Sequence, residues 1–138
     1  MNNYFSTIHE IIRTGHWITD SISKELKEFG IYEPQYNVLR VLNDANGTAI
    51  SVNTILDHMV QRSSNVTRIV DKLESKGLVE RRLSLEDRRK MDILITKEGM
   101  LLLKELDAKV YAFHKPMLKN LSTDENDMLR KLIKKLKG

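Results

Sequence analysis

The sequence has no cysteine among its 138 residues. Disulfide bonds, thiolate metal sites and redox sensing through cysteine are therefore excluded, and a reducing compartment suits the chain. No apolar run approaches the roughly 18 residues that a membrane-spanning helix needs. The first residues, MNNYFSTIHE, lack the basic start and the apolar stretch of a signal peptide. We therefore expect a cytoplasmic protein without a membrane partner.

Residue arrangements that support catalysis are also missing. The sequence contains no nucleophile elbow, no phosphate-binding loop and no histidine pair at metal-ligand spacing. His9 and His16 are seven residues apart and could share a helix face. A metal sensor would need further ligands, which would have to come from residues such as Glu10, Asp20 or His114. Surface or interface histidines are the commoner explanation, so we expect a protein that is not an enzyme and uses no cofactor or metal.

Aromatic residues make up only 6% of the chain, whereas hydrophobic residues make up 41% and charged residues 30%. The core should therefore be mainly aliphatic, and the length suits one domain, residues 1–138. The net charge of +4 is unevenly distributed, because residues 61–90 contain nine Lys or Arg and only five Asp or Glu, while the rest of the chain is balanced. A local basic excess is typical of a nucleic-acid-binding surface.

Helical periodicity dominates both ends of the chain. An amphipathic helix is predicted from Ser6 to Phe29, and others begin after Thr96 and after Ser122. Ser122 and Glu125 form the S-x-x-E pattern of a capping box, and Pro116 should kink or end the preceding helix. These long helices exceed what one small domain needs for its core. We therefore expect them to pair two copies of the chain, in regions of about residues 3–29 and 97–137.

The middle of the chain, about residues 33–98, predicts a winged helix. A buried helix begins at Glu33-Pro34, and two short helices follow, each with apolar residues at the i, i+3, i+4, i+7 spacing. Their connecting turn lacks the glycine that often marks a helix-turn-helix. Two predicted strands, 78–82 and 91–95, then form a hairpin around a polar loop. The fold class is therefore mainly α with a small β-hairpin.

The second short helix is predicted from Ser63 to Lys76, with Ser63 or Ser64 as its N-cap. Its apolar residues share one side, and its other side carries short polar groups and cations. Short polar side chains reach bases or phosphates without filling the major groove, and arginine pairs bidentately with guanine. The alternative is an ordinary solvated face. The residues that we expect to contact DNA from this helix are Ser63, Ser64, Asn65, Thr67, Arg68 and Lys72.

The loop between the two strands contains Arg88, Arg89 and Lys90 beside Glu86 and Asp87. A narrow minor groove concentrates negative potential and attracts inserted arginines. Acidic neighbours suit this function if Asp87 positions a neighbouring arginine or makes the loop rigid. The alternative is a solvated turn of mixed charge. We expect Asp87, Arg88, Arg89 and Lys90 to belong to the DNA-binding surface.

These segments resemble the MarR family of bacterial transcriptional regulators. The resemblance covers nearly the whole chain and is strongest in SSNVTRIVDKLESKGLVERR and EDRRKMDILITKEG. Asp87-Arg88-Arg89 matches the D-x-R pattern of the family's wing. The family's L-T-x-x-G pattern is matched by the segment from Ile95 to Gly99, in which isoleucine replaces leucine.

The resemblance implies a winged-helix homodimer in which the terminal helices of two subunits interdigitate. It also implies that the helix from Ser63 to Lys76 reads the major groove of double-stranded DNA, and that Arg89 enters the minor groove. Family members commonly repress neighbouring genes, and many bind small phenolic effectors that weaken DNA binding. The expected function is therefore that of a repressor on a pseudo-palindromic operator. A winged-helix module that binds protein rather than DNA is the alternative.

Four residues near the first two helices could line an effector pocket: Arg13, His16, Trp17 and Tyr36. Core packing is the alternative explanation for each aromatic residue. The C-terminal run RKLIKKLKG is basic and amphipathic. Such a run suits either a membrane-surface helix or a dimer helix with a solvated basic face, and we favour the dimer helix.

Overall fold

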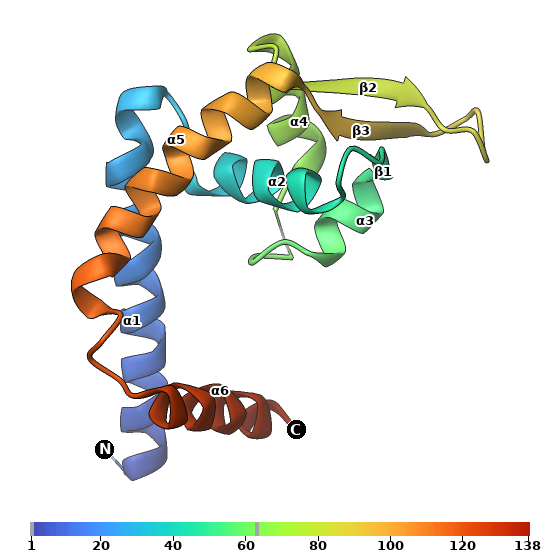
Figure 1. Cartoon of the computed structure of the whole chain (residues 1–138). Helices are drawn as coiled ribbons and strands as arrows, with labels where there is room; N and C mark the ends of the chain where they lie inside the picture. The colour runs from blue at the N-terminus through green and yellow to red at the C-terminus, as the bar shows by residue number, and fades with distance from the viewer. Residues whose placement is uncertain (1, 63) are drawn as a thin grey trace.

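The structure is a computed structural model that describes residues 2–62 and 64–138. Most of this chain is helical, and a small sheet lies beside the middle helices (Figure 1). The elements follow one another in the order α1 (Asn3–Leu26), η1 (Lys27–Phe29), α2 (Glu33–Asp44), β1 (Ile50–Ser51), α3 (Val52–Asp57), α4 (Val66–Ser75), β2 (Val79–Leu83), β3 (Met91–Ile95), α5 (Lys97–His114), η2 (Lys115–Met117) and α6 (Thr123–Lys137).

The sheet has three antiparallel strands in the order β1-β3-β2. The two longer strands form the expected hairpin, in which Val79 pairs with Ile95. The short strand β1 adds to the other edge, with Ile50 opposite Ile93. The predicted fold, a mainly helical winged helix-turn-helix with long terminal helices, is confirmed.

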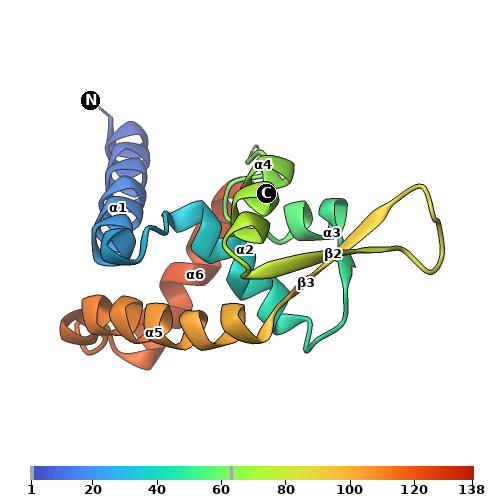
Figure 2. The ribbon, with the colours of Figure 1, turned by 90° about the horizontal axis from the view of Figure 1, so that it is seen from above.

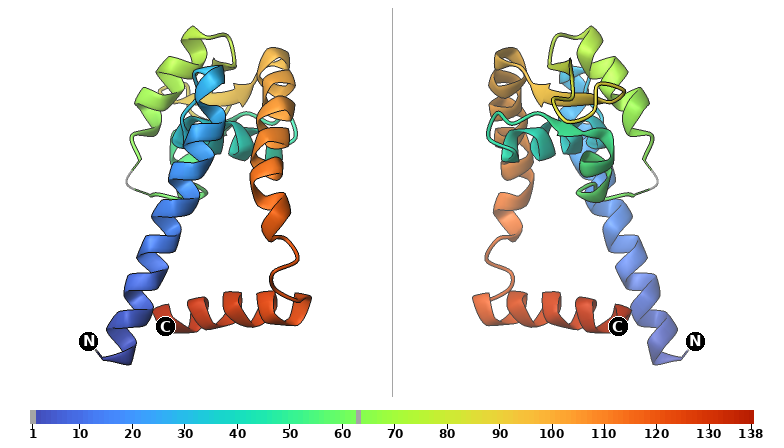
Figure 3. Two further views of the ribbon diagram at one scale, coloured as in Figure 1. Left: turned by 90° about the vertical axis from the view of Figure 1, so that its left-hand side faces the viewer. Right: turned by 90° about the vertical axis from the view of Figure 1, so that its right-hand side faces the viewer.

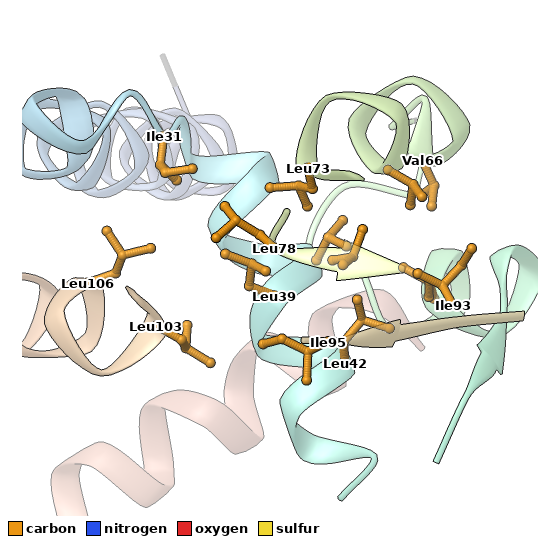
Figure 4. Close-up of a cluster of buried hydrophobic side chains, with 14 of the residues drawn as sticks. Ile31, Leu39, Leu42, Val66, Leu73, Leu78, Ile93, Ile95, Leu103 and Leu106 are labelled. Atoms are coloured by element: carbon orange, nitrogen blue, oxygen red, sulfur yellow. The ribbon is translucent and has the colours of Figure 1, made fainter. Parts of the chain in front are cut away.

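The core lies between α2, α4, α5 and the sheet (Figure 4). It is aliphatic, as the low aromatic content predicts. Each fully buried leucine or isoleucine contributes roughly 1.5–3 kcal/mol through removal of apolar surface from water. This packing holds α4 against the hairpin. The largest fully buried side chains are Leu26, Ile31, Leu39, Leu42, Ile55, Leu73, Ile93, Leu103 and Leu106.

The start of α5 packs closely on the turn that precedes β2. The hydroxyl of Thr96 accepts a hydrogen bond from the Gly99 N–H at 3.0 Å and donates one to the Gly77 carbonyl at 2.7 Å. A Cβ atom at Gly99 would clash with the carbonyl oxygen of Leu78. The T-x-x-G pattern of the sequence therefore has a packing cause, since only glycine lets α5 approach this backbone.

The helices α1, α5 and α6 extend away from this core, and α6 lies across the far ends of the other two (Figures 1 and 3). The predicted first helix begins at Asn3 rather than Ser6, and a 3-10 turn precedes Gly30, whose φ is +68°. Of the two effects expected of Pro116, a kink or an end, the structure shows an end, because α5 stops at His114 and η2 follows. The expected capping box is formed by Ser122 and Glu125.

The wing hairpin projects from the opposite end of the molecule from α1 (Figures 1 and 2). Within the described residues, no helix combines the length and the apolar character that a membrane span requires.

Candidate DNA-binding interface

Helix α4 begins at Val66, three residues later than the sequence predicts, and its N-cap is Asn65 rather than a serine. The Asn65 side-chain oxygen accepts a hydrogen bond from the Arg68 N–H at 3.1 Å. This contact satisfies one of the free N–H groups at the helix start. Ser64 precedes the helix and is half-buried, and Ser63 lies outside the described residues.

The outer face of α4 presents the cations that the sequence predicts. Val66, Val70 and Leu73 are buried, which turns Thr67, Arg68 and Lys72 toward solvent. Neither Arg68 nor Lys72 forms an ion pair within residues 2–62 and 64–138. Unpaired exposed cations keep their full attraction for phosphate, because no ion pair within the protein has to break before they bind it.

Arg81, which no pattern in the sequence singles out, joins α4 to the wing. Arg81 of β2 donates to Glu74 Oε1 at 2.6 Å and also to Asp71 Oδ1. The side chain of Arg81 is only 23% exposed. The hydrogen bond to Asp71 raises the pKa of this guanidinium further above its ordinary value. The signal in the sequence was faint, because periodicity places Asp71 and Glu74 on the outer side of α4 without indicating which basic residue faces them.

The wing loop closes through its own backbone. The Ser84 N–H donates to the Lys90 carbonyl at 3.0 Å, and the Lys90 N–H donates to the Asp87 carbonyl at 2.9 Å. The hydroxyl of Ser84 accepts the N–H groups of Glu86 and Asp87, each at 3.3 Å. These bonds define one loop conformation at the end of the hairpin, and they present Arg88, Arg89 and Lys90 to solvent.

Asp87 bonds to Arg89, which is one of the two functions expected of this acidic residue in the wing. Its Oδ1 accepts the Arg89 backbone N–H at 3.0 Å and the Arg89 Nε–H at 3.2 Å. The backbone hydrogen bond, followed by the side-chain one, holds the pKa of the Asp87 carboxyl below its ordinary value. The Arg89 side chain is nevertheless 90% exposed. Asp87 therefore orients Arg89 through its backbone N–H and its guanidinium, and the guanidinium still faces solvent.

The structure does not gather the four predicted effector residues around one cavity. Trp17 lines a cavity of about 540 Å³ between α1, the end of α5 and the start of α6, and its ring lies 5.6 Å from that of Phe113. Arg13 and His16 are exposed on α1 and are not among the residues that line this cavity. The residues that line it are Thr14, Trp17, Ile18, His114, Met117, Leu118, Leu121, Ser122, Thr123 and Asn126.

Tyr36 instead joins α2 to α5. Its hydroxyl donates to Asp107 Oδ1 at 2.6 Å, and Arg40 donates to Asp107 Oδ2 at 3.0 Å. Burial and the bond to Asp107 raise the pKa of Tyr36 well above its ordinary value, so this hydroxyl stays protonated.

In the part of the chain that the structure describes, no group of three or more His, Cys, Asp or Glu residues is placed to hold a metal ion, and His9 and His16 belong to no such group.

Comparison with known proteins finds a matching family model and similar sequences. A sequence model described as "MarR family" matches residues 29–90. The transcriptional regulator PapX of Escherichia coli is 34% identical over 125 residues, which is 91% of this chain and 76% of PapX.

Two solved structures share the fold. CouR of Rhodococcus jostii RHA1, bound to p-coumaroyl-CoA, is 25% identical with a TM-score of 0.79 over 91% of this chain and 87% of that one. The S. aureus MepR–DNA complex has a TM-score of 0.85 at 20% identity, over 98% of this chain and 96% of that one. The winged-helix fold, the cationic face of α4 and the wing arginine bonded to Asp87 agree with these matches. The chain belongs to the MarR family of transcriptional regulators.

Proposed function

We propose that this protein is a homodimeric repressor that binds a pseudo-palindromic operator. The observation that carries the proposal is the presence of two exposed cationic elements on one packed body. One is the α4 face around Arg68, which suits a major groove, and the other is the wing loop around Arg89, which suits a minor groove. MepR, which has the same fold, was solved in complex with DNA. A regulator that binds double-stranded DNA in this way would act in the cytoplasm.

The terminal helices support the dimer. None of the residues of α6 is buried, and only Leu26 is buried on α1. An amphipathic helix with an uncovered apolar stripe is stabilised when another surface removes that stripe from water. In a two-fold dimer the two copies of α4 would be about one DNA turn apart. The exposed apolar residues of α6 are Met128, Leu129, Leu132, Ile133 and Leu136.

We propose further that a small aromatic ligand regulates DNA binding from the cavity that Trp17 lines. This cavity touches α1, α5 and α6, the same elements that would set the distance between the two DNA-binding units. CouR, a relative in fold, was solved with an aromatic acyl-CoA ligand. The chain has one tryptophan, so its fluorescence reports this cavity alone. Titration with salicylate or p-coumarate should change that fluorescence at the concentrations that release DNA, and a signal without DNA release would contradict regulation from this site.

The DNA-binding proposal is tested with labelled DNA from upstream of the gene. The wild-type protein should bind it with an affinity that falls steeply as salt rises, because phosphate contacts release counterions. Arg68→Ala and Arg89→Ala should each weaken binding by about tenfold or more, since a good arginine contact contributes about 1–3 kcal/mol. Lys104→Ala, which removes one positive charge from the exposed face of α5, is the matched control.

Loss of affinity in both arginine variants, with the dimer intact by sedimentation, supports the assignment. Unchanged affinity in both would contradict it. Absence of any salt-sensitive DNA binding by the wild type would favour a winged-helix module that binds protein. A reporter gene behind the bound DNA distinguishes repression from activation, and we expect its expression to rise when the protein is deleted.

A further inference from the structure

Arg81 holds a fixed position on β2, an edge strand of the sheet. It lies in the middle of β2, opposite Ile93 of β3, whose side chain is fully buried. From there its guanidinium reaches α4 and bonds Asp71 through Nη2 and Glu74 through Nη1. These two carboxylates are three residues apart and therefore lie on the same side of the helix. One arginine thus attaches two successive points of α4 to a strand of the wing.

This attachment restrains α4 in a way that its apolar contacts do not. Apolar packing is non-directional, so by itself it tolerates small rotations of a helix. A guanidinium that bonds two carboxylates has a defined geometry. Rotation of α4 about its axis would break one of the two bonds, and it would also swing Thr67 and Arg68 away from their outward positions.

The same contact balances charge on the helix. Asp71 and Glu74 are exposed on α4 beside Arg68 and Lys72. Two uncompensated carboxylates there would offset the attraction of those cations for DNA phosphates. Arg81 supplies a positive charge to both carboxylates without occupying the solvent-facing surface of the helix.

We propose that Arg81 is a positioning residue for operator recognition, which couples the orientation of the recognition helix α4 to the wing and partly offsets the negative charge of its two carboxylates. This inference rests on the proposed DNA-binding function. It assigns Arg81 an effect that acts through Asp71 and Glu74, and not through a contact of its own with DNA. The two kinds of contact make different predictions when the carboxylates are removed.

The test is a double-mutant cycle in DNA affinity. Arg81→Gln should weaken operator binding by about tenfold, the cost expected for losing hydrogen bonds to charged groups. Arg81→Lys, which keeps the charge but cannot bond both carboxylates with a fixed fork, should fall between wild type and Arg81→Gln. In the background Asp71→Asn/Glu74→Gln, the same Arg81→Gln change should alter affinity by less than about twofold.

Arg40→Gln is the matched control. Arg40 also pairs with two carboxylates, those of Asp107 at 3.0 Å and Asp44 at 3.6 Å, and these ion pairs join α2 to α5 and not to α4. We expect it to leave operator affinity within about twofold of wild type, in line with the small effects of surface ion pairs. Circular dichroism and sedimentation should report a folded dimer for every variant, so that a lost fold is not mistaken for lost positioning.

The outcomes separate the two proposals. If the wild type binds DNA and Arg81→Gln weakens binding equally with and without the two carboxylates, Arg81 contacts DNA directly and the positioning function is wrong. If the wild type binds and Arg81→Gln has no effect, the inference alone is overturned. If the wild type binds no DNA, the proposed function fails and the inference fails with it.

Discussion

The winged-helix body of this protein (α2 to β3 and the start of α5) and its helical arms (α1 and α6) differ in how completely they bury their apolar residues. In the body, α2, α4 and the sheet surround a core that includes Leu39, Leu73 and Ile93, all fully buried. In the arms, α6 buries nothing, and Trp17 on α1 remains half exposed. The body is thus stabilised by contacts within one chain, whereas the arms present a surface that a second chain would complete.

This difference separates two determinants of DNA binding. The body fixes what is presented to the DNA, because Asp87 holds Arg89 and Arg81 holds α4. The arms would fix how far apart two such bodies lie. Changes in the body should therefore alter folding or the affinity of each half-site, and changes in the arms should alter dimerisation.

The largest expected effect is on folding of the body. Leu39→Ala, at a side chain with no exposed surface, should lower the free energy of unfolding by about 2–5 kcal/mol, because it removes buried methyl groups and leaves a cavity. Leu132→Ala on α6 is the matched change in the arms, at a side chain that is 53% exposed. Urea denaturation of monomers at low protein concentration should show a smaller loss of unfolding free energy for Leu132→Ala than for Leu39→Ala. Equal losses would mean that α6 belongs to the core of a single chain.

A pair of glycine substitutions sharpens the same comparison. Gly99→Ala should destabilise the protein by about 1–3 kcal/mol, because the added Cβ meets the Leu78 backbone and forces α5 away from the sheet. Gly15→Ala lies within α1, where the added Cβ would have no neighbour within 4 Å beyond the adjacent residues and the backbone of its own helix. It should stabilise the helix by up to about 1 kcal/mol. Thermal unfolding measures both, and destabilisation by Gly15→Ala would contradict an α1 surface that is open in the single chain.

Dimerisation should respond to a charge on the apolar face of α6. Leu132→Glu should raise the dissociation constant of the dimer by at least about tenfold, since a two-fold dimer places the substitution in its interface twice. The circular dichroism of the monomer should remain that of the wild type. Lys131→Glu, on the neighbouring exposed position, is the control. Analytical ultracentrifugation supplies the measurement, and an unchanged dimer in Leu132→Glu would exclude this face from the interface.

The smallest expected effect concerns the contact between Asp87 and Arg89 in the wing. Asp87→Asn removes the charge that holds Arg89 and should weaken operator binding by about threefold, a loss typical of an exposed ion pair. The pKa of Asp87 is depressed in the folded protein, so its contribution is present above the ordinary value and is lost only as pH falls through the depressed one. Wild-type affinity should therefore not vary between pH 6 and 8 through this group. If the contribution of Asp87 to DNA affinity were lost between pH 6 and 8, the proposed contact with Arg89 would be contradicted.

Much of this structure could be predicted from the sequence, because its signals are local. Periodicity located the helices, Thr96 and the Ser122–Glu125 capping box marked their starts, and the alternation of residues 91–95 marked a strand. The wing contact between Asp87 and Arg89 could also be anticipated, since the two residues are only two positions apart.

Contacts between elements could not be predicted in the same way. The sequence placed a serine cap on α4, whereas Asn65 caps it, because several polar residues in a row offer equivalent local solutions. The contact of Arg81 with Asp71 and Glu74, and that of Tyr36 with Asp107, join residues from different elements. Periodicity indicates which face of a helix is buried, but not which neighbour meets its polar side.

Hydroxyl-radical footprinting on the bound DNA tests the central claim most directly, because the radical attacks deoxyribose in the minor groove. The account predicts a two-fold symmetric pattern whose half-sites are centred about ten base pairs apart or a multiple of that. It also predicts flanking minor-groove protection that disappears in Arg89→Ala while protection near α4 remains. A single asymmetric footprint, or flanking protection unchanged by Arg89→Ala, would contradict a dimer that reads the major groove with α4 and the minor groove with its wing.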